Sequence, residues 1–311
     1  MIGGKSFAKI QNLCLYTQKL TTLAELIICL MVIVHTAEEL QNRVKSNKSS
    51  LGLVPTMGAL HLGHLSLIKR ATDENKQVVV SIYVNPTQFN RIEDLENYPT
   101  DLTKDIDLLK PFEKKLILYI PAHEELYPDG IKSKKYDFGS LTAYMEGTHR
   151  PGHFDGVATI VEALLEKIRP SKAYFGEKDF QQLQVIKALN QHLALGIEII
   201  SCPLIREESG LAYSSRNSLL SLEQKSNALV IHQTLEYLNK NAYDWSVAEM
   251  ELYFKSKVEV IKDFEVDYFS IAEPSNLIPV KQLDSRKAYR MFVAVFVGKT
   301  RLIDTVELVR K

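Results

Sequence analysis

The sequence has little that would indicate a secreted, membrane-bound or nucleic-acid-binding protein. Its three cysteines, Cys14, Cys29 and Cys202, form neither a close metal-binding pair nor an even disulfide framework, which favours a reducing cytosol. The formal net charge is zero, because 38 Lys and Arg residues balance 38 Asp and Glu residues. The protein as a whole therefore has no electrostatic field that would attract nucleic acid or anionic membranes. We therefore predict a cytoplasmic protein whose partners are small molecules.

The hydrophobic pattern of the sequence does not predict a membrane-spanning segment either. The apolar run at residues 23–34 contains Glu25 and is shorter than the roughly 20 apolar residues that span a bilayer. It also lacks the small-residue cleavage site of a signal peptide and continues directly into a strand-like segment. We expect the compact domain to begin near Met31, with residues 1–30 as an extension outside it.

From Met31 onward, strand-like and helix-like segments alternate, which predicts an open α/β sheet. The pattern predicts strands at residues 31–35, 51–54, 78–84, 116–120, 173–175 and 197–200. It predicts intervening helices that include residues 65–74, 99–109, 155–168 and 181–189. After Asn217 the pattern changes to two helices, at residues 221–238 and 246–261, followed by strands at 266–271, 289–297 and 301–308. This change predicts a second, smaller α+β domain.

A loop with two histidines joins the predicted strand at residues 51–54 to the next helix. Gly58 and Gly63 permit close approach of the backbone to a ligand, and His64 falls at the predicted start of the helix, where free N–H groups attract anions. His61 and His64 can both donate hydrogen bonds, and their charge is tunable near neutral pH. A surface loop would carry the same pattern, but the flanking strand and helix favour a phosphate-binding loop.

Further polar segments follow the other predicted strands. Asn85 and Gln88 lie just beyond the strand at 78–84, where ligands bind in open α/β sheets, although a structural turn is the alternative. Possible phosphate contacts come from a glycine-led turn with a lysine at a helix start and from a serine-arginine loop: Gly176, Glu177, Lys178, Asp179, Ser214, Ser215 and Arg216. The acidic residues Glu93, Asp94 and Glu96 could meet magnesium, but we favour a solvated loop.

Taken together and in chain order, these segments resemble the pantothenate synthetase (pantoate–β-alanine ligase) family of the His-x-Gly-His nucleotidyltransferase superfamily. The resemblance extends from Met31 to the end of the chain and includes Arg150-Pro151-Gly152-His153-Phe154. It implies a Rossmann-like, doubly wound parallel sheet over residues 31–213 and a smaller C-terminal α+β domain over residues 214–311. It also implies ATP-dependent condensation of pantoate with β-alanine through a pantoyl adenylate, with release of AMP and pyrophosphate.

The resemblance implies roles for individual residues. His64, as proton donor, together with His61, Lys178 and Arg216 would be catalytic, and Gln88, Gln182, Asn85 and Arg150 would bind the acid substrates. The ATP site would comprise Pro55, Thr56, Met57, Gly58, His61, Gly63, His64, Gly176, Glu177, Lys178, Asp179, Ile205, Tyr213, Ser214, Ser215 and Arg216. Mg²⁺ would accompany ATP on ligands that the motifs do not identify, and the family implies a homodimer. One departure is Thr100, where many relatives carry arginine.

Two alternatives remain open at the level of sequence. Another His-x-Gly-His enzyme, such as a nucleotidyltransferase acting on a phosphate ester or the core of a class I aminoacyl-tRNA synthetase, would share the histidine loop. A synthetase predicts a basic RNA-binding domain and a lysine-rich second signature, whereas this chain has Ser214, Ser215, Arg216 and Asn217. A binding protein that has lost turnover is the second alternative, and the intact set of His61, His64, Lys178 and Arg216 argues against it.

Overall fold

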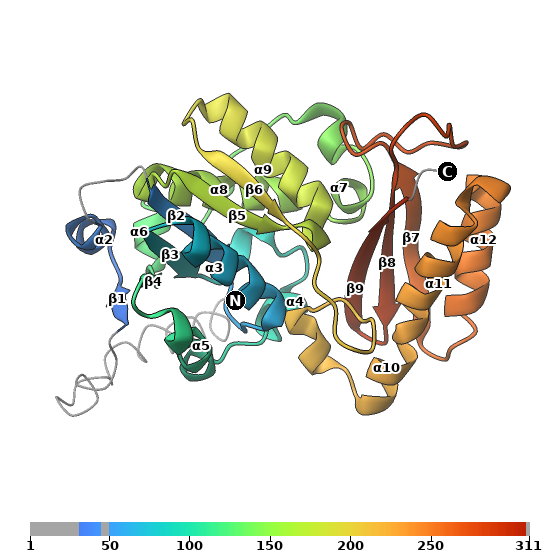
Figure 1. Cartoon of the computed structure of the whole chain (residues 1–311), viewed down its shortest axis with the longest axis horizontal. Helices are drawn as coiled ribbons and strands as arrows, with labels where there is room; N and C mark the ends of the chain where they lie inside the picture. The colour runs from blue at the N-terminus through green and yellow to red at the C-terminus, as the bar shows by residue number, and fades with distance from the viewer. Residues whose placement is uncertain (1–30, 45–49, 309–311) are drawn as a thin grey trace, which may run out of the picture.

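The fold consists of two units that follow one another along the chain (Figure 1). The computed structural model describes residues 31–44 and 50–308, so the predicted extension at residues 1–30 lies outside the described residues. The first unit contains β1 (Val32–Val34), α2 (Ala37–Arg43), β2 (Leu51–Thr56), α3 (Leu62–Glu74), β3 (Gln77–Ile82), α4 (Ile92–Glu96), α5 (Leu102–Leu109), β4 (Leu116–Tyr119), α6 (His123–Leu126), α7 (Glu146–His149), α8 (His153–Ile168), β5 (Lys172–Gly176), α9 (Phe180–Leu193) and β6 (Glu198–Cys202). The second contains α10 (Leu222–Asn227), α11 (Leu229–Lys240), α12 (Val247–Val258), β7 (Phe264–Ala272), β8 (Arg290–Val297) and β9 (Thr300–Glu307).

The first unit is built on a six-stranded parallel sheet. The strand order is β1-β4-β3-β2-β5-β6, and each neighbouring pair is parallel. The chain runs outward from β2 through β3 to β4 on one side, and from β5 to β6 on the other. β2 and β5 therefore flank the point where the winding reverses, and ligands bind beyond the carboxyl ends of strands at such a point. The predicted doubly wound α/β fold is confirmed.

Burial on both faces of the sheet explains why its inner strands β2, β3 and β4 are largely apolar. Along β4, Ile117 and Tyr119 pack into the core that α8 and α9 cover, whereas Leu116 and Leu118 pack into the core under α3 and α5. Successive side chains of a strand point to opposite faces, so a strand covered on both faces needs apolar residues at every position. For this reason, short continuous apolar runs in the sequence predict the strands of this sheet.

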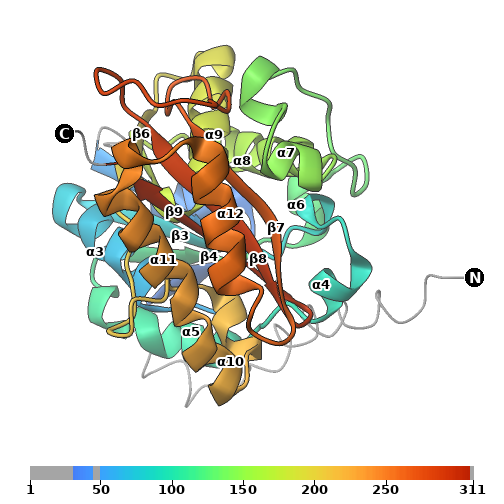
Figure 2. The same ribbon diagram turned by 90° about the vertical axis from the view of Figure 1, so that its right-hand side faces the viewer.

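The second unit is a three-stranded antiparallel sheet, β7-β8-β9, with helices on its outer face. α11 and α12 cover the face that is turned away from the first unit (Figure 2). The opposite face meets α9, where the rings of Phe292 and Phe180 lie 6.0 Å apart and the guanidinium of Arg290 lies 4.2 Å from the centre of the Phe180 ring. The small sheet is therefore packed directly against the unit that carries the strand ends. The predicted boundary, between residues 213 and 214, falls in the segment between β6 and α10.

Three helix boundaries differ from the sequence-based expectation. α3 begins at Leu62 with His61 as its N-cap, so His64 lies within the first turn instead of at the start. α5 begins at Leu102, not at Pro99, because the Asp101 carboxylate accepts a hydrogen bond of 3.0 Å from the Lys104 N–H and caps the helix there. The single helix expected over residues 221–238 is interrupted at Ala228, which separates α10 from α11.

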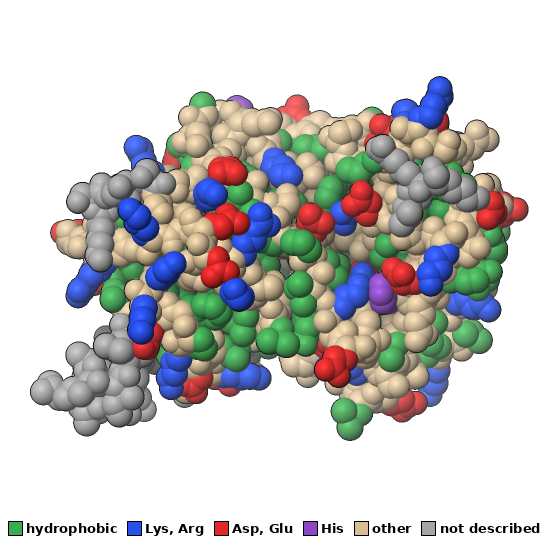
Figure 3. Space-filling model, viewed as in Figure 1, with side chains coloured by type: hydrophobic (Ala, Val, Ile, Leu, Met, Phe, Trp, Pro, Cys, Tyr) green, Lys and Arg blue, Asp and Glu red, His purple; other side chains and the backbone are tan. Residues whose placement is uncertain are grey.

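Charged side chains of both signs are interspersed over the face seen in Figure 3, and no large area of one sign stands out. Over the residues that the structure describes, no helix combines the length and apolar character needed to cross a membrane.

Candidate active site

The histidine loop between β2 and α3 is held by a buried carboxylate. Gly58 and Ala59 both have positive φ angles, 79° and 49°, so the chain reverses sharply at the end of β2. Asp105 on α5 accepts hydrogen bonds from the backbone N–H groups of Ala59 (2.9 Å) and Leu60 (2.6 Å). Burial raises the pKa of the Asp105 carboxyl. The loop thus has its shape before any ligand arrives, and Asp105 is a structural residue that the motif did not indicate.

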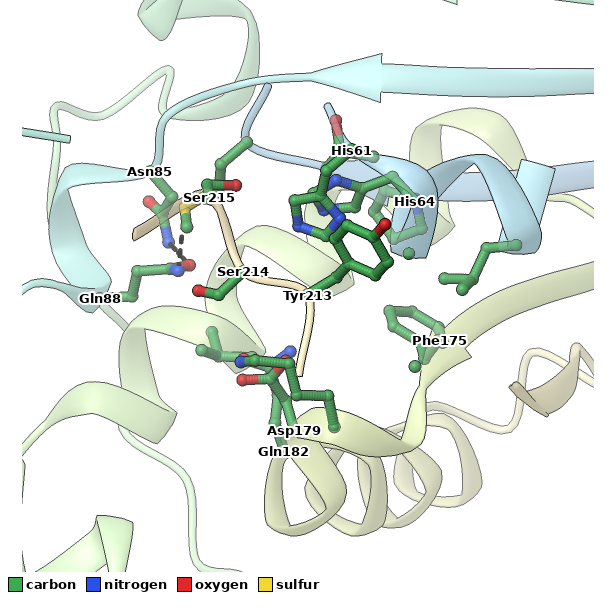
Figure 4. Close-up of a pocket in the computed structure, with 18 of the residues that line it drawn as sticks. His61, His64, Asn85, Gln88, Phe175, Asp179, Gln182, Tyr213, Ser214 and Ser215 are labelled. Carbon is green, nitrogen blue, oxygen red and sulfur yellow. Dashed lines mark hydrogen bonds and ion pairs between the residues drawn. The ribbon is translucent and has the colours of Figure 1, made fainter. Parts of the chain in front are cut away.

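The two histidines of the motif stack on each other and face into one cavity (Figure 4). Their ring centres lie 4.0 Å apart, and the His61 ring stacks in turn on Tyr213 at 5.8 Å. A Cβ on Gly63 would lie 2.9 Å from atoms of the His61 ring, so only glycine allows this arrangement. Among the described residues, the Nδ1 atoms of His61 and His64 are buried without a hydrogen-bond partner. Both rings therefore keep hydrogen-bonding capacity that no described protein group uses.

Both imidazoles are neutral near pH 7. Burial, helped by the nearby charge of Lys178, lowers the pKa of His61 to about 4. Burial also holds the pKa of His64 well below its usual range, with His61 and Lys178 adding to the effect. Each ring in the ligand-free protein therefore carries one N–H. A polyanion placed between the rings and Lys178 would favour their protonation, because opposite charge favours the charged form.

The end of β5 and the serine-arginine loop form further walls. Lys178 faces the cavity, and its Nζ lies 3.6 Å from the carboxylate of Asp179. Ser215 Oγ donates a hydrogen bond of 3.1 Å to the Ala59 carbonyl, which ties this loop to the histidine loop. The guanidinium of Arg216 forms two hydrogen bonds, of 3.1 and 2.8 Å, with the Asp94 carboxylate. The expectation of a solvated acidic loop is wrong in two respects, because Glu93, Asp94 and Glu96 lie on the helix α4 and because Asp94 pairs with a cavity residue. Glu93 and Glu96 are exposed, as expected.

The opposite end of the cavity is an amide cluster on the turn after β3. Asn85 is 1 % exposed, and its Nδ2 donates hydrogen bonds of 3.1 Å to both Gln88 Oε1 and the Gly156 carbonyl. Its Oδ1 accepts hydrogen bonds from the hydroxyls of Tyr127 (2.6 Å) and Thr87 (3.0 Å). Every hydrogen-bonding position of the Asn85 side chain is thus in use, and the geometry makes Asn85 a support for Gln88.

The backbone of the same turn is fixed from α8. A Cβ on Gly156 would lie 2.3 Å from the Thr87 carbonyl oxygen, so helix and turn are in direct backbone contact. The Gln88 carbonyl accepts hydrogen bonds from Arg150 Nη2 (3.1 Å) and His153 Nδ1 (2.9 Å). Burial, together with the charge of Arg150, lowers the pKa of His153 to about 3, so this ring is a neutral donor. The amide end is consequently rigid.

One cavity of about 240 Å³ brings these segments together. Its lining includes every predicted site residue except Gly58 and Glu177. Gly58 forms the turn beneath the loop, and Glu177 points to Arg290, with which it forms an ion pair of 3.1 Å. Residues that sequence reasoning missed also line the cavity: Leu67, Tyr83, Tyr98, His153, Val157, Ile160, Val161, Leu164, Tyr174, Phe175, Pro203 and Leu204. His153 and Tyr98 belong to recognisable segments, but their motifs carry no sign that these side chains face a ligand.

The charge of the cavity suits an anion. Lys178, Arg150 and Arg216 supply three cations to the lining, against the single carboxylate of Asp179. Within residues 31–44 and 50–308, no group of three or more His, Cys, Asp or Glu side chains is arranged to hold a metal ion. Mg²⁺ commonly binds through one or two carboxylates and substrate phosphates, and retains several waters. Asp179 is therefore compatible with an ion that enters on a phosphorylated ligand.

Comparison with known proteins agrees with this geometry. The family model of pantoate-beta-alanine ligase matches residues 32–307. Pantothenate synthetase of Christiangramia forsetii is 45% identical over 266 residues, which cover 86% of this chain and 94% of that protein. The crystal structure of pantothenate synthetase from Thermus thermophilus superposes with a TM-score of 0.82 at 41% identity and covers 89% of this chain and 99% of its own.

A further solved structure carries ligands. Pantoate-beta-alanine ligase from Francisella tularensis, complexed with beta-gamma ATP and beta-alanine, is 35% identical and has a TM-score of 0.75, with 89% of this chain and 97% of that chain covered. The fold, the cavity at the winding reversal and the match over almost the whole described length all lead to one assignment. This chain is a member of the pantoate–β-alanine ligase family.

Proposed function

We infer that this chain condenses pantoate with β-alanine at the expense of ATP, through a pantoyl adenylate, and releases AMP and pyrophosphate. Family membership supports the reaction. The observation that carries it to this site is the pair of buried histidines with unpartnered Nδ1 atoms, on the same cavity as Lys178. Such a set suits a phosphate, because the imidazoles keep hydrogen-bonding capacity that no described protein group uses, and Lys178, 3.6 Å from the Asp179 carboxylate, adds positive charge.

We propose that ATP lies along the histidine loop and the two loops that face it. The triphosphate would contact His61, His64 and Lys178, with Ser214, Ser215 and Arg216 at the same wall. Met57 and Ile205 would line the nucleotide site. The guanidinium of Arg216 pairs with Asp94, and ATP would compete with that carboxylate for it. Mg²⁺ would arrive with ATP, and Asp179, the one carboxylate among the described residues that line the cavity, would be its protein ligand.

The amide cluster would bind pantoate at the other end of the cavity. Gln88 and Gln182 are neutral donors and acceptors that can bond a hydroxy acid without trapping its carboxylate. The carboxylate oxygen would attack the α-phosphorus, a P–O bond would form, and the bond to pyrophosphate would break. His64 would donate a proton or hydrogen bond to the developing charge, and alignment of the reactants would supply much of the acceleration.

In the second step, the β-alanine amine attacks the acyl carbon of the adenylate. A C–N bond forms, the acyl C–O bond breaks, AMP leaves, and the amine loses its proton. We further propose that residues 31–213 and 214–311 form the two domains of each subunit, and that the protein is a cytoplasmic homodimer.

The first test is release of AMP and pyrophosphate by the full chain with ATP and Mg²⁺. We expect sustained release only when pantoate and β-alanine are both present, and pantothenate in equal amount to AMP. ATP binding without any turnover would contradict the proposal and favour a binding protein. Turnover with a phosphate ester in place of pantoate would favour the alternative nucleotidyltransferase.

A further inference from the structure

A buried glutamate lies where the two units meet. Glu146, at the start of α7, is 6 % exposed, and both of its carboxylate oxygens accept hydrogen bonds from the second unit. Arg301 on β9 donates Nη1 to Oε2 at 2.9 Å and Nη2 to Oε1 at 2.7 Å, a two-point contact. The Tyr268 hydroxyl on β7 donates a third hydrogen bond, of 2.9 Å, to Oε1. The first unit thus presents one carboxylate, and the second unit surrounds it with donors.

Arg301 is itself held in position by a second carboxylate. Its Nε donates a hydrogen bond of 2.8 Å to Asp267 Oδ2 on β7, and Asp267 Oδ1 lies 2.7 Å from His149 Nδ1 on α7. The guanidinium therefore uses three nitrogens on two carboxylates, which leaves it little freedom to rotate. Burial opposes ionisation of Glu146, but the hydrogen bonds and charge of Arg301 lower its pKa to about 2, so the pair is ionised.

The contacts continue from Glu146 into the cavity. Arg150 Nη1 lies 3.3 Å from Glu146 Oε2 and 3.2 Å from His153 Nε2. Arg150 Nη2 and His153 Nδ1 both donate to the Gln88 carbonyl, as described above. Because His153 Nδ1 donates to a carbonyl, its Nε2 is the acceptor for Arg150. Unbroken contacts therefore run from β9 through Glu146 and Arg150 to the backbone of Gln88.

We propose that Arg301 is a positioning residue that sets the affinity for pantoate, acting through Glu146 and Arg150 on the turn at residues 85–88. The inference rests on the proposed function, in which Gln88 binds pantoate. In this inference Arg150 orients the Gln88 turn and does not contact the substrate directly, because both of its terminal nitrogens are bonded to protein groups. The second unit would then control the acid end of the cavity without touching the acid.

The physical reason lies in how buried ion pairs act. Such a pair adds little net stability compared with a well-packed apolar pair, but its directional hydrogen bonds specify one geometry. If Arg301 is removed, Glu146 keeps a single cationic partner, and Arg150 is drawn toward it and away from the Gln88 carbonyl. A displacement of a fraction of an ångström at a substrate-binding turn weakens binding and alignment.

The test compares the KM values for pantoate and ATP in Arg301→Gln, Arg301→Lys and Glu146→Gln, measured by AMP release at saturating β-alanine. We expect the pantoate KM to rise about 10-fold in Arg301→Gln and Glu146→Gln, with a smaller rise in Arg301→Lys and an ATP KM within about 2-fold of the parent. The double variant Arg301→Gln/Glu146→Gln should be no worse than either single variant, because both changes break the same contacts. If Arg301→Gln fails to fold, the two milder variants carry the test.

Ser140→Ala provides the matched control. Ser140 Oγ donates a hydrogen bond of 2.7 Å to the Asn276 carbonyl, a contact between the two units that does not involve Glu146. Its pantoate KM should stay at the parent value. If the parent is active and the folded Arg301 and Glu146 variants keep its pantoate KM, the inference is overturned, but the proposed function is not. Absence of pantoate-dependent AMP release from the unaltered chain would overturn the proposed function, and the inference with it.

Discussion

The two ends of the cavity differ in how completely the protein bonds its own polar groups. At the histidine end, the Nδ1 atoms of His61 and His64 are buried and lack a partner among the described residues. At the amide end, Asn85 uses every hydrogen-bonding position of its side chain, and the Gln88 carbonyl has two donors. Figure 4 shows the two groups on opposite sides of the same space.

This contrast separates two ways of building a binding site. Unpartnered buried polar atoms cost stability until a ligand satisfies them, so ligand binding completes the histidine end. A fully bonded cluster presents fixed groups and loses little conformational entropy on binding, so the amide end is ready in advance. Changes at the first end should therefore affect chemistry, and changes at the second should affect affinity and stability.

The largest effect is expected for His64→Ala. We expect adenylate formation to fall on the order of 100-fold or more, because one transition-state contact is lost. Folding should stay intact, since no described protein group bonds His64 Nδ1. The assay is pantoate-dependent pyrophosphate release, with His192→Ala on the exposed surface of α9 as control. A folded His64→Ala protein with near-parent activity would contradict the assigned role.

Acid should destabilise the fold through both ends. The folded protein holds the pKa of His61 near 4 and that of His153 near 3, and lowers those of His64, His123 and His232. The unfolded chain binds protons at these histidines below about pH 6.5. Stability is therefore fully present above that pH and falls as the pH drops toward 4. The loss is up to about 1.4 kcal/mol per pH unit for each of His61, His64 and His153, and smaller for His123 and His232, which are only partly buried.

Urea unfolding at several pH values between about 7.5 and 5 measures this slope. The variant His61→Asn/His64→Asn should show a shallower dependence, and the difference from the parent gives the share of the histidine end. The remaining slope reports His153 together with His123 and His232, which lie outside the cavity lining. A free energy of unfolding that does not change over this range would show that the buried imidazoles do not resist protonation.

Tyr127→Phe tests the amide end. The change removes the 2.6 Å hydrogen bond to Asn85 Oδ1 but leaves that of Thr87, so Asn85 is partly released. We expect the pantoate KM to rise about 5-fold and the stability to fall by about 1 kcal/mol, with kcat little changed. Tyr119→Phe is the control, because the buried Tyr119 hydroxyl has no partner among the described residues. If Tyr127→Phe lowered kcat and left the pantoate KM unchanged, the proposed division of the cavity into an end for chemistry and an end for affinity would be wrong.

The smallest effect is expected for Thr100→Arg, which introduces the arginine that the family resemblance leads us to expect at this position. Thr100 is exposed and precedes the Asp101 cap of α5. Surface changes of this kind typically alter stability by less than about 0.5 kcal/mol, so both KM values should stay within about 2-fold. A rise in activity of about 5-fold or more would instead assign arginine at this position a part in ATP binding.

The sequence was sufficient for the fold because the inner strands of the parallel sheet are largely apolar and because strand-like runs alternate with helical patterns. Helix starts were harder to predict. The Asp101 side chain caps α5 about one turn after the expected start, and α3 begins about one turn before the expected start, after His61, whose side chain makes no capping hydrogen bond. The change to an antiparallel second unit was also visible in the pattern. How that unit packs was not, because the contact of Phe292 with Phe180 depends on tertiary structure alone.

Candidate site residues were predictable where a motif places them at a strand end or helix start. The structure gathers those segments around one cavity, and the ligand contacts themselves stay predictions. Pairings across long separations left no trace in the sequence: Arg301 and Glu146 are 155 positions apart, and Arg216 and Asp94 are 122 apart. A single sequence does not reveal which charged residues meet when no local spacing constrains them.

The direct contact between Gly156 and the Thr87 carbonyl limits how this enzyme family could be redesigned for other hydroxy acids. No side chain at position 156 fits without displacing the turn that carries Gln88. The backbone of α8 and that of the turn at residues 85–88 are already in contact, so the proposed acid pocket cannot be enlarged by substitution at position 156. Room for a bulkier acid would have to come from across the cavity, where Met57 lies against the Gln88 amide at 3.0 Å and can be shortened without moving either backbone.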